Sequence, residues 1–249
     1  MDVPVIFEDR FFIIIDKPSG VTVNRSENAL ENTVQDWAEK KLRPSADGQN
    51  LKFNTEFESD FYKRAGIVHR LDKDTSGLLL IAKDENSFKI LQDQFLKRTV
   101  KKTYFALIHG KMQTKEMTVK APVGRLPWAR RKFGVIPGGR DAETRIKVVK
   151  SYADSSDKLY TLVKAFPVTG RTHQIRIHLK QAGFPLVGDP LYSGRKDYRE
   201  DKIICPRLFL HHSAIEFAHP GTGKISVYTS NLPGELVEVL EILKLISYN

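Results

Sequence analysis

A run of consecutive apolar residues at positions 78–82 constrains the fold of this chain more than any other feature. It lies within SGLLLIAK, residues 76–83, where neither set of alternating positions is polar. A strand with this pattern is buried on both of its faces. The longest apolar runs, FFIII and LLLIA, are far too short to span a bilayer. The run therefore predicts an interior strand of a globular protein.

The remaining pattern contains more strands than helices. Strands are predicted within 5–16 and at 102–110, 144–153, 159–168, 208–218 and 224–230, and helices at 32–42, 85–98, 172–183 and 235–246. Asn32 or Thr33, Asp84 and Thr172 are the expected helix caps, with Gly183 as a stop. Residues 43–63 are expected to form a polar surface loop. Because several strands are joined by hairpin-length connections, we expect an α+β fold, with flanking helices on a mixed, largely antiparallel sheet.

The positive charge is concentrated in one segment. The chain carries a net charge of +10, and residues 97–150 contain fifteen Lys or Arg against three Asp or Glu. Such a local excess favours a surface that binds a polyanion, most often nucleic acid. A solvated face without a partner is the alternative. The single Cys205 and the absence of a secretory signal in MDVPVIFEDR predict a cytoplasmic protein.

Chemistry that needs a cofactor or metal is not indicated. The sequence lacks GxxxxGK[ST] and GxGxxG loops, so no nucleotide cofactor is expected. His173 and His178 are five residues apart, about 140° around a helix, and do not share a face. Asp72 and Asp74 have Lys73 between them and no third acid nearby. We therefore expect neither a metal site nor a cofactor.

Asp72 is the most informative single residue. In GIVHRLDKDTSGLLL, residues 66–80, it stands between Arg70 and Lys73 at the start of the buried strand. Neighbouring cations favour the ionised carboxylate. A permanently ionised carboxylate is a poor general base, but it can act as a nucleophile or stabilise a cationic centre. A turn-capping aspartate is the alternative, because DKDTSG is rich in turn residues.

Four motifs in order relate this acid to a family. HRLDKDTSG resembles the segment around the nucleophile of the RluA-type pseudouridine synthases. DKPSG (16–20), KKTYFALIHG (101–110) and GRTHQIRIHL (170–179) with GFPLVGDPLY (183–192) resemble their other motifs. The resemblance covers residues 5 to about 230. It implies the pseudouridine synthase fold, as a single catalytic domain over 1–249 with a central RNA-binding cleft.

The resemblance also implies roles for individual residues. Asp72 matches the catalytic aspartate, Tyr104 the tyrosine that packs on the target base, and Arg176 the basic residue that pairs with the aspartate. Arg70 matches the residue that fills the RNA stack after the uridine has left it. The remaining substrate-binding candidates in the matched motif are Arg171, Gln174, Ile175 and Leu179. Arg171 is expected either to touch phosphate or to hold its own loop.

The implied activity is isomerisation of uridine to pseudouridine in rRNA or tRNA, by base flipping and an aspartate nucleophile. The carboxylate attacks either C1′ of the sugar or C6 of the base. A basic insertion at about 111–142 is expected to contact RNA through Arg125, Trp128, Arg130 and Arg131. A solvated hairpin is the alternative there.

We expect a monomer without an additional N-terminal RNA-binding domain and without membrane association. A non-catalytic ribosome-assembly factor and a uracil-releasing glycosylase are the rival functions.

Overall fold

The apolar run at 78–82 belongs to strand β3, Ser76–Ala82, in which every residue is buried. Its antiparallel neighbour β2, Phe12–Lys17, is almost as fully buried, and Ile14 lies opposite Leu80. Burial of apolar side chains stabilises by roughly 25 cal/mol per Å², so this pair forms a strongly stabilised centre. The prediction of a strand buried on both faces is confirmed.

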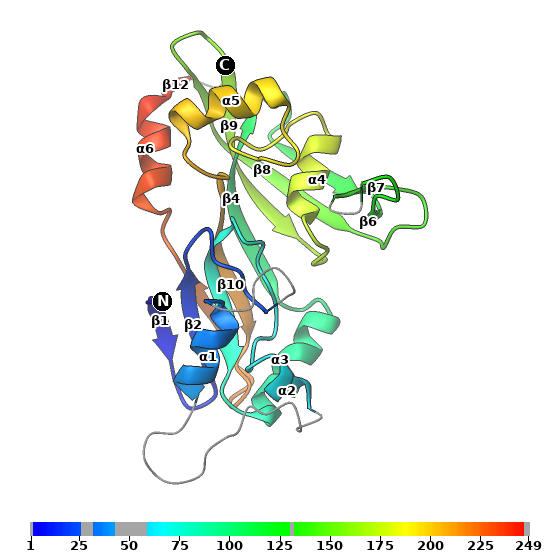
Figure 1. The fold of residues 1–249 in the computed structure, drawn as a ribbon, viewed down its shortest axis with the longest axis vertical. Helices are drawn as coiled ribbons and strands as arrows, with labels where there is room; N and C mark the ends of the chain where they lie inside the picture. Colours follow the sequence, from blue (N-terminus) through cyan, green and yellow to red (C-terminus); the bar gives the residue numbers. More distant parts are fainter. Residues whose placement is uncertain (1, 26–31, 43–58, 130–131, 247–249) are drawn as a thin grey trace. The chain divides into compact units, whose positions relative to one another are not determined.

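The computed structural model describes residues 2–25, 32–42, 59–129 and 132–246. The chain groups into two compact units, one formed by residues 1–100 with 215–230 and the other by 101–214 with 231–249. Strand β10, Leu210–Ala218, begins in the second unit and ends in the first (orange in Figure 1). Predicted features that fall on residues 26–31, 43–58 and 130–131 lie outside the described residues.

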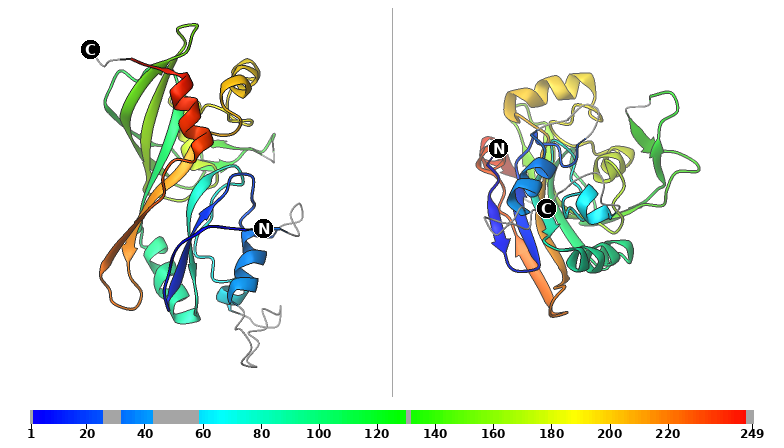
Figure 2. Two further views of the ribbon diagram at one scale, coloured as in Figure 1. Left: turned by 90° about the vertical axis from the view of Figure 1, so that its left-hand side faces the viewer. Right: turned by 60° about the horizontal axis from the view of Figure 1, so that its bottom comes forward.

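The first unit is a sheet with helices packed against it (Figures 1 and 2). Its strand order is β1 (Val5–Glu8), β2, β3 and β10, with β11 (Ile225–Thr229) paired to β10. The helices are α1 (Val34–Leu42), α2 (Asp60–Lys63) and α3 (Glu85–Leu96). Phe88 and Leu91 of α3 join Leu80 and Phe217 of the sheet in one apolar core.

Local capping signals set where two of these helices begin. Thr33 and Asp36 form a reciprocal capping pair: Thr33 N donates to Asp36 Oδ2 at 2.7 Å and Asp36 N donates to Thr33 Oγ1 at 3.2 Å. At α3 the Asp84 carboxylate accepts from Ser87 N at 2.8 Å. Thr33 and Asp84 are therefore confirmed as caps.

The β-rich segment 5–16 contains two strands, because Asp9 closes a turn between them. Its Oδ1 accepts from Phe11 N at 2.7 Å and from Phe12 N at 2.9 Å. Its Oδ2 accepts from His219 Nε2 at 2.8 Å. Burial by itself raises the pKa of Asp9, but these hydrogen bonds together lower it.

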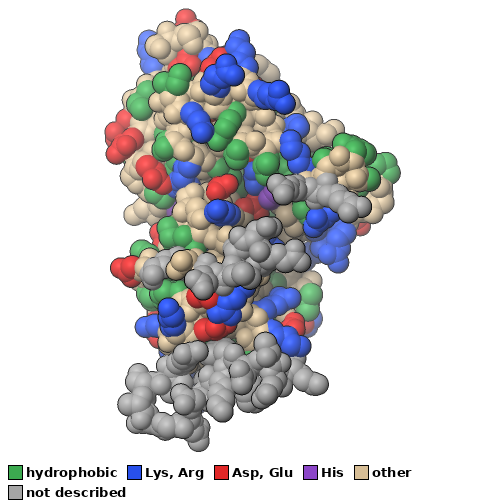
Figure 3. Space-filling view, in the orientation of Figure 1, with side chains coloured by type: hydrophobic (Ala, Val, Ile, Leu, Met, Phe, Trp, Pro, Cys, Tyr) green, Lys and Arg blue, Asp and Glu red, His purple; other side chains and the backbone are tan. Residues whose placement is uncertain are grey.

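The second unit is a larger antiparallel sheet. Its strand order is β10, β4 (Lys101–His109), β9 (Leu159–Pro167), β8 (Glu143–Ala153) and β12 (Lys244–Ile246), with β5 (Glu116–Lys120) also paired to β8. Strands β6 (Val123–Arg125) and β7 (Phe133–Val135) form a separate hairpin. The helices are α4 (Gln174–Gln181), α5 (Arg195–Ile204) and α6 (Gly234–Ile242). On the face drawn in Figure 3, Lys and Arg side chains lie over this unit, including beside the β6–β7 hairpin.

Some predicted boundaries in the second unit are wrong. The N-cap of α4 is His173, in the left-handed conformation at φ 56°, and not Thr172. The Gln174 side chain supplies the acceptor at this end, taking a hydrogen bond from Arg171 N at 3.0 Å. Gly183, at φ 87°, is confirmed as the stop.

The helix predicted over 235–246 is also shorter than expected. It ends at Ile242, because residues 244–246 pair with β8 as strand β12. Helix α5 has no counterpart in the prediction, because its sequence RKDYREDKII lacks a continuous apolar stripe. Within the described ranges, no helix is long and apolar enough to cross a membrane.

Candidate active site

Asp72 lies in a tight turn that leads into β3. It is partly buried, and its carbonyl accepts from Thr75 N at 3.2 Å. The preceding Leu71 is 4% exposed, whereas Arg70 is exposed. The turn thus buries its apolar residue and leaves Arg70 at the surface, where it can reach a nucleic acid.

The DKPSG motif holds this turn from the other side. The Lys17 side chain is fully buried, and its ammonium donates to the carbonyls of Pro18, Val21 and Lys73 at 2.8, 2.9 and 3.0 Å. Ser19 Oγ donates to the carbonyl of Asp74 at 2.8 Å. An ammonium has three donors, so each of them has an acceptor here. The motif therefore fixes the backbone on the C-terminal side of Asp72.

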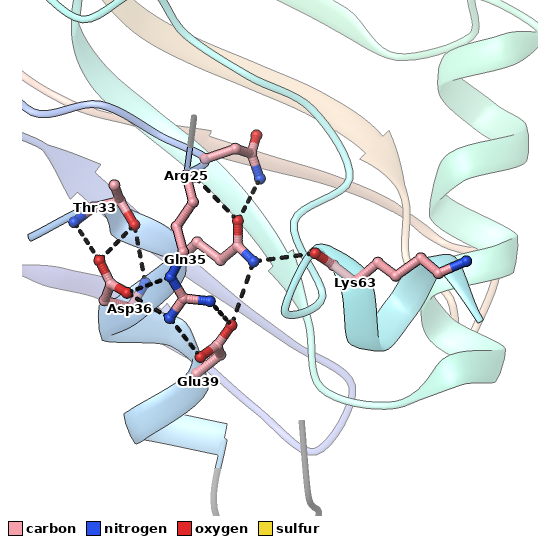
Figure 4. Close-up of polar contacts among 7 residues, drawn as sticks. Arg25, Thr33, Gln35, Asp36, Glu39 and Lys63 are labelled. Carbon is pink, nitrogen blue, oxygen red and sulfur yellow. Dashed lines mark hydrogen bonds and ion pairs between the residues drawn. The ribbon is translucent and has the colours of Figure 1, made fainter. Parts of the chain in front are cut away.

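The segment after DKPSG is anchored to α1 through Arg25 (Figure 4). Arg25 Nη1 and Nη2 donate to Glu39 at 2.6 and 2.7 Å, and Nε donates to Asp36 at 2.7 Å. These hydrogen bonds, led by those to Glu39, raise the pKa of the guanidinium. From the same helix, Gln35 Nε2 donates to the Lys63 carbonyl at 3.0 Å, so α1 also holds α2.

His69 has a structural role in the first unit. Its Nε2 accepts from Leu80 N at 3.0 Å, so this nitrogen carries no proton. Its ring stacks on Phe95, with centroids 4.8 Å apart. These contacts fix the chain just before Arg70 and Asp72.

Tyr104 lies on β4 in the second unit and is 7% exposed. Its ring stacks on His212 of β10, with centroids 4.4 Å apart and an interplanar angle of 14°. His212 therefore covers one face of the tyrosine ring. A target base that packs on Tyr104 must use the opposite face.

Arg176 of α4 is 2% exposed and bound to a fully buried acid, Asp189. Its Nε and Nη2 each donate to one carboxylate oxygen at 2.8 Å, which is the bidentate geometry of a strong arginine–carboxylate pair. Asp189 Oδ1 also accepts from Leu191 N at 2.9 Å and Tyr192 N at 3.1 Å. The guanidinium lies over the Tyr192 ring, 5.0 Å from its centroid. The GFPLVGDPLY motif thus orients Arg176.

Gln174 connects the start of α4 to the sheet. Its Oε1 accepts from Thr169 Oγ1 at 2.6 Å, and its Nε2 donates to the Glu143 carbonyl at 2.9 Å and to Thr144 Oγ1 at 3.0 Å. On the next turn, His178 bonds to the same Thr144 hydroxyl at 2.9 Å. Burial lowers the pKa of His178. The Gln174 amide is thus saturated within the unit, which favours a structural role over contact with RNA.

The other residues of the GRTHQIRIHL motif lie within α4 or just before it. Arg171 Nε donates to the Asp141 carbonyl at 3.2 Å, which favours the loop-holding alternative. Ile175 is 6% exposed and Leu179 is fully buried. His173 Nδ1 lies 2.8 Å from the Tyr192 hydroxyl, which also accepts from Phe133 N at 3.3 Å. The N-terminus of α4 is therefore tied to the β6–β7 hairpin.

Among the described residues, no group of three or more His, Cys, Asp or Glu side chains could hold a metal ion. Of the predicted catalytic residues, Asp72 places a carboxylate in the first unit, and Tyr104 and Arg176 place a phenol and a buried guanidinium in the second. The pairing of Asp72 with Arg176 stays a prediction.

The sequence matches the family described as RNA pseudouridylate synthase over residues 11–181. This range contains Asp72, Tyr104 and Arg176. The chain belongs to the RNA pseudouridylate synthase family.

Family members with similar sequences include curated bacterial proteins. The chain is 37% identical over 243 residues to the ribosomal large subunit pseudouridine synthase D of Nitrosomonas europaea, covering 96% of this chain and 65% of that protein. It is 34% identical over 244 residues to the uncharacterized RNA pseudouridine synthase YlyB of Bacillus subtilis, covering 98% and 74%. The human RNA pseudouridylate synthase domain containing 1 superimposes with a TM-score of 0.73 at 23% identity, over 99% of this chain and 89% of that one. The predicted α+β fold is confirmed.

In this chain, the β6–β7 hairpin and the loop that joins its strands carry the predicted RNA-contacting residues. Trp128 is 79% exposed, and the Arg125 guanidinium lies 5.1 Å from the centroid of the Phe133 ring. Arg130 and Arg131 lie outside the described residues. The exposed Trp128 indole is available for stacking on a nucleobase.

Two residues that support this site were not singled out from the sequence. Lys17 and Asp189 both lie in the quoted motifs DKPSG and GFPLVGDPLY. Both could have been noticed in the sequence as charged residues inside motifs that are otherwise apolar or rich in turn residues. What they bind is not visible in the sequence, because the Lys73 carbonyl is 56 positions from Lys17.

Proposed function

We propose that this protein isomerises uridine to pseudouridine in a structured RNA, with Asp72 as the nucleophile. Large-subunit ribosomal RNA is the first candidate substrate, because the relative from Nitrosomonas europaea is named for it. A tRNA stem-loop is the alternative substrate. The observation that carries the proposal is the match over residues 11–181, which includes Asp72 in a turn that the Lys17 ammonium holds.

The reaction begins with removal of the uridine from the base stack, which costs a few kcal/mol. Arg70 is exposed next to Asp72, and its guanidinium plane can stack on the bases that the uridine leaves behind. The Trp128 indole and nearby cations of the hairpin hold the surrounding RNA.

The Asp72 carboxylate then attacks the flipped nucleotide at C1′ of the sugar or at C6 of the base. The N1–C1′ bond breaks, the pyrimidine rotates, and a C5–C1′ bond forms. The bond between Asp72 and the nucleotide breaks again, C5 loses its proton and N1 takes one up. No group is added and no oxidation state changes, so the balance needs no cofactor. Tyr104 holds the detached ring by stacking, and apolar neighbours such as Ile175 exclude water, which would otherwise leave an abasic nucleotide.

The test is tritium release from RNA labelled at C5 of uridine, using RNA from a strain without this gene. The wild-type protein is expected to release tritium without added metal or nucleotide. Asp72→Asn should slow release by about 10⁴-fold or more, by analogy with the loss of other enzymatic nucleophiles. Asp74→Asn, two residues along the same turn, is the matched control and should retain activity.

The outcomes separate the rival functions. RNA binding without release would support a non-catalytic assembly factor, and free uracil in place of pseudouridine would support a glycosylase. Equal release by wild type and Asp72→Asn would remove Asp72 from its role. Mapping the modified position by mass spectrometry would distinguish rRNA from tRNA. We also propose that the enzyme acts in the cytoplasm as a monomer, which fractionation and size-exclusion chromatography would check.

A further inference from the structure

Lys102 lies on β4 two residues before Tyr104, so both side chains project from the same face of the strand. The strand register extends this face across the unit. Tyr104 lies opposite Ala165 of β9, and Ala165 lies opposite Ile146 of β8.

The same face of the sheet packs against α4. Thr144 lies two residues from Ile146 along β8, and its hydroxyl bonds to Gln174 and His178 of α4. Lys102 therefore belongs to the face that carries Tyr104 and α4.

The ammonium of Lys102 lies beside the GRTHQIR motif. Within the described part of the second unit, it has one hydrogen-bond acceptor, the Thr169 carbonyl at 3.4 Å, and no carboxylate at ion-pairing distance. A Cβ placed on Gly170 would lie 4.0 Å from the Lys102 nitrogen, so no side chain separates the ammonium from this loop. By contrast, the three donors of the buried Lys17 ammonium all have carbonyl acceptors.

The Lys102 ammonium is partly buried, and most of its hydrogen-bonding capacity is not used within its unit. Burial lowers the pKa of Lys102 to about 8, which leaves it mainly protonated at neutral pH. Two of its donors have no protein acceptor in the described second unit, so they are available to water or to a ligand. Ionisable groups with a shifted pKa and few hydrogen-bond partners in the protein are often found at functional sites.

We propose that Lys102 donates a hydrogen bond to a carbonyl oxygen of the target uracil and stabilises the negative charge that the ring acquires during the reaction. This inference rests on the proposed function. It adds to the site a cation that acts on the base, whereas Asp72 acts on the sugar carbon or on C6.

The chemistry requires such a group in either route. Cleavage of N1–C1′ leaves the bonding electron pair on the uracil, where it is delocalised onto O2 and O4. Addition of the carboxylate to C6 places negative charge on O4 as an enolate. The charge develops only as the reaction proceeds, so a fixed donor stabilises the transition state more than the bound substrate. Lys102 keeps its protons throughout.

Other titratable groups also lie on this face. They are Tyr104 and His212 on the sheet, and His173, Arg176 and His178 with Asp189 at α4. Burial lowers the pKa of His178, so it moves away from the range of Lys102. The part of the pH profile that belongs to Lys102 is therefore the part that the Lys102 variants lose.

The experiment is single-turnover tritium release from pH 6 to 10, using RNA from the deletion strain. The pH profile is measured at subsaturating RNA, where it reports the RNA-free protein, and the maximal rate is measured at saturating RNA. The variants are Lys102→Met, Lys102→Arg and Lys101→Met, the last removing an exposed neighbouring lysine. The wild-type rate should fall tenfold per pH unit above about pH 8. Lys102→Met should be about 10²-fold slower, without this fall and with RNA affinity within twofold of wild type. Lys102→Arg should keep most of the activity and lose the fall, and Lys101→Met should match wild type.

Three outcomes would overturn the proposal. Weaker RNA binding by Lys102→Met with an unchanged saturated rate would mean that Lys102 contacts a phosphate. A wild-type rate and pH profile for every variant would remove Lys102 from the reaction while leaving the proposed function intact. No release by the wild-type protein would refute the proposed function and the role of Lys102 with it.

Discussion

Replacement of Asp189 by Asn tests whether the buried acid is what holds Arg176. The exposed fractions are 2% for Arg176 and 0% for Asp189, so water does not screen their interaction. The substitution keeps an oxygen that can accept from Leu191 N and Tyr192 N. It removes the negative charge and one of the two acceptors at 2.8 Å. The buried guanidinium then loses its ion pair with Asp189.

Breaking a buried ion pair in this way destabilises by about 3–5 kcal/mol. We therefore expect Asp189→Asn to lower the free energy of unfolding by that amount, measured by urea denaturation followed by circular dichroism. The exposed pair of Lys147 and Glu116 in the same unit is the matched control, with side chains 60% and 66% exposed. Glu116→Gln should change stability by less than about 1 kcal/mol.

The double variant Arg176→Met with Asp189→Asn distinguishes loss of the ion pair from other destabilising effects of the substitution. It removes both charges, so it should be more stable than Asp189→Asn alone, and the cycle should show a coupling energy. A loss below about 1 kcal/mol for Asp189→Asn, or strictly additive effects in the double variant, would refute the reasoning.

Three further predictions concern other parts of the chain. Lys17→Met should lower the free energy of unfolding by about 3 kcal/mol or more and speed hydrogen exchange at Thr75 N, because three carbonyls lose the ammonium that donates to them. Unchanged exchange would show that Lys17 does not hold this turn. Trp128→Ala should leave stability within about 0.5 kcal/mol but weaken RNA binding by about 1–3 kcal/mol in a filter-binding titration, and equal affinity would exclude stacking. Asp9 has a lowered pKa, so its contribution to stability is complete above its unfolded pKa near 3.9 and is lost as the pH falls through the folded value. In Asp9→Asn, the free energy of unfolding should decrease less as the pH is lowered than it does in the wild type. An unchanged pH dependence at acid pH would show that Asp9 does not contribute to it.

The fold was predictable where a few neighbouring residues decide the structure. The uninterrupted apolar run of β3 can only be buried, and the caps at Thr33 and Asp84 are closed by partners three residues away. Gly183 ends α4 because its positive φ favours glycine. The register of β12 and the position of α5 were not predictable, because both depend on surfaces supplied by distant segments.

In the candidate site, too, local motifs were predictable and contacts between distant segments were not. The order of four motifs located Asp72, Tyr104 and Arg176 and the family to which the chain belongs. The motifs did not reveal that a buried acid would bind Arg176, or that His212 would cover one face of Tyr104. They also gave no indication that Lys102 would have no carboxylate at ion-pairing distance in the described part of its unit.

The sequence by itself determined which reactive groups this chain possesses and in what order they occur, because periodicity, caps and motifs act over a few residues. Only the tertiary structure decided which charges are neutralised. Desolvation and hydrogen bonding depend on the atoms that surround a group in space, and those atoms come from segments far apart in the chain.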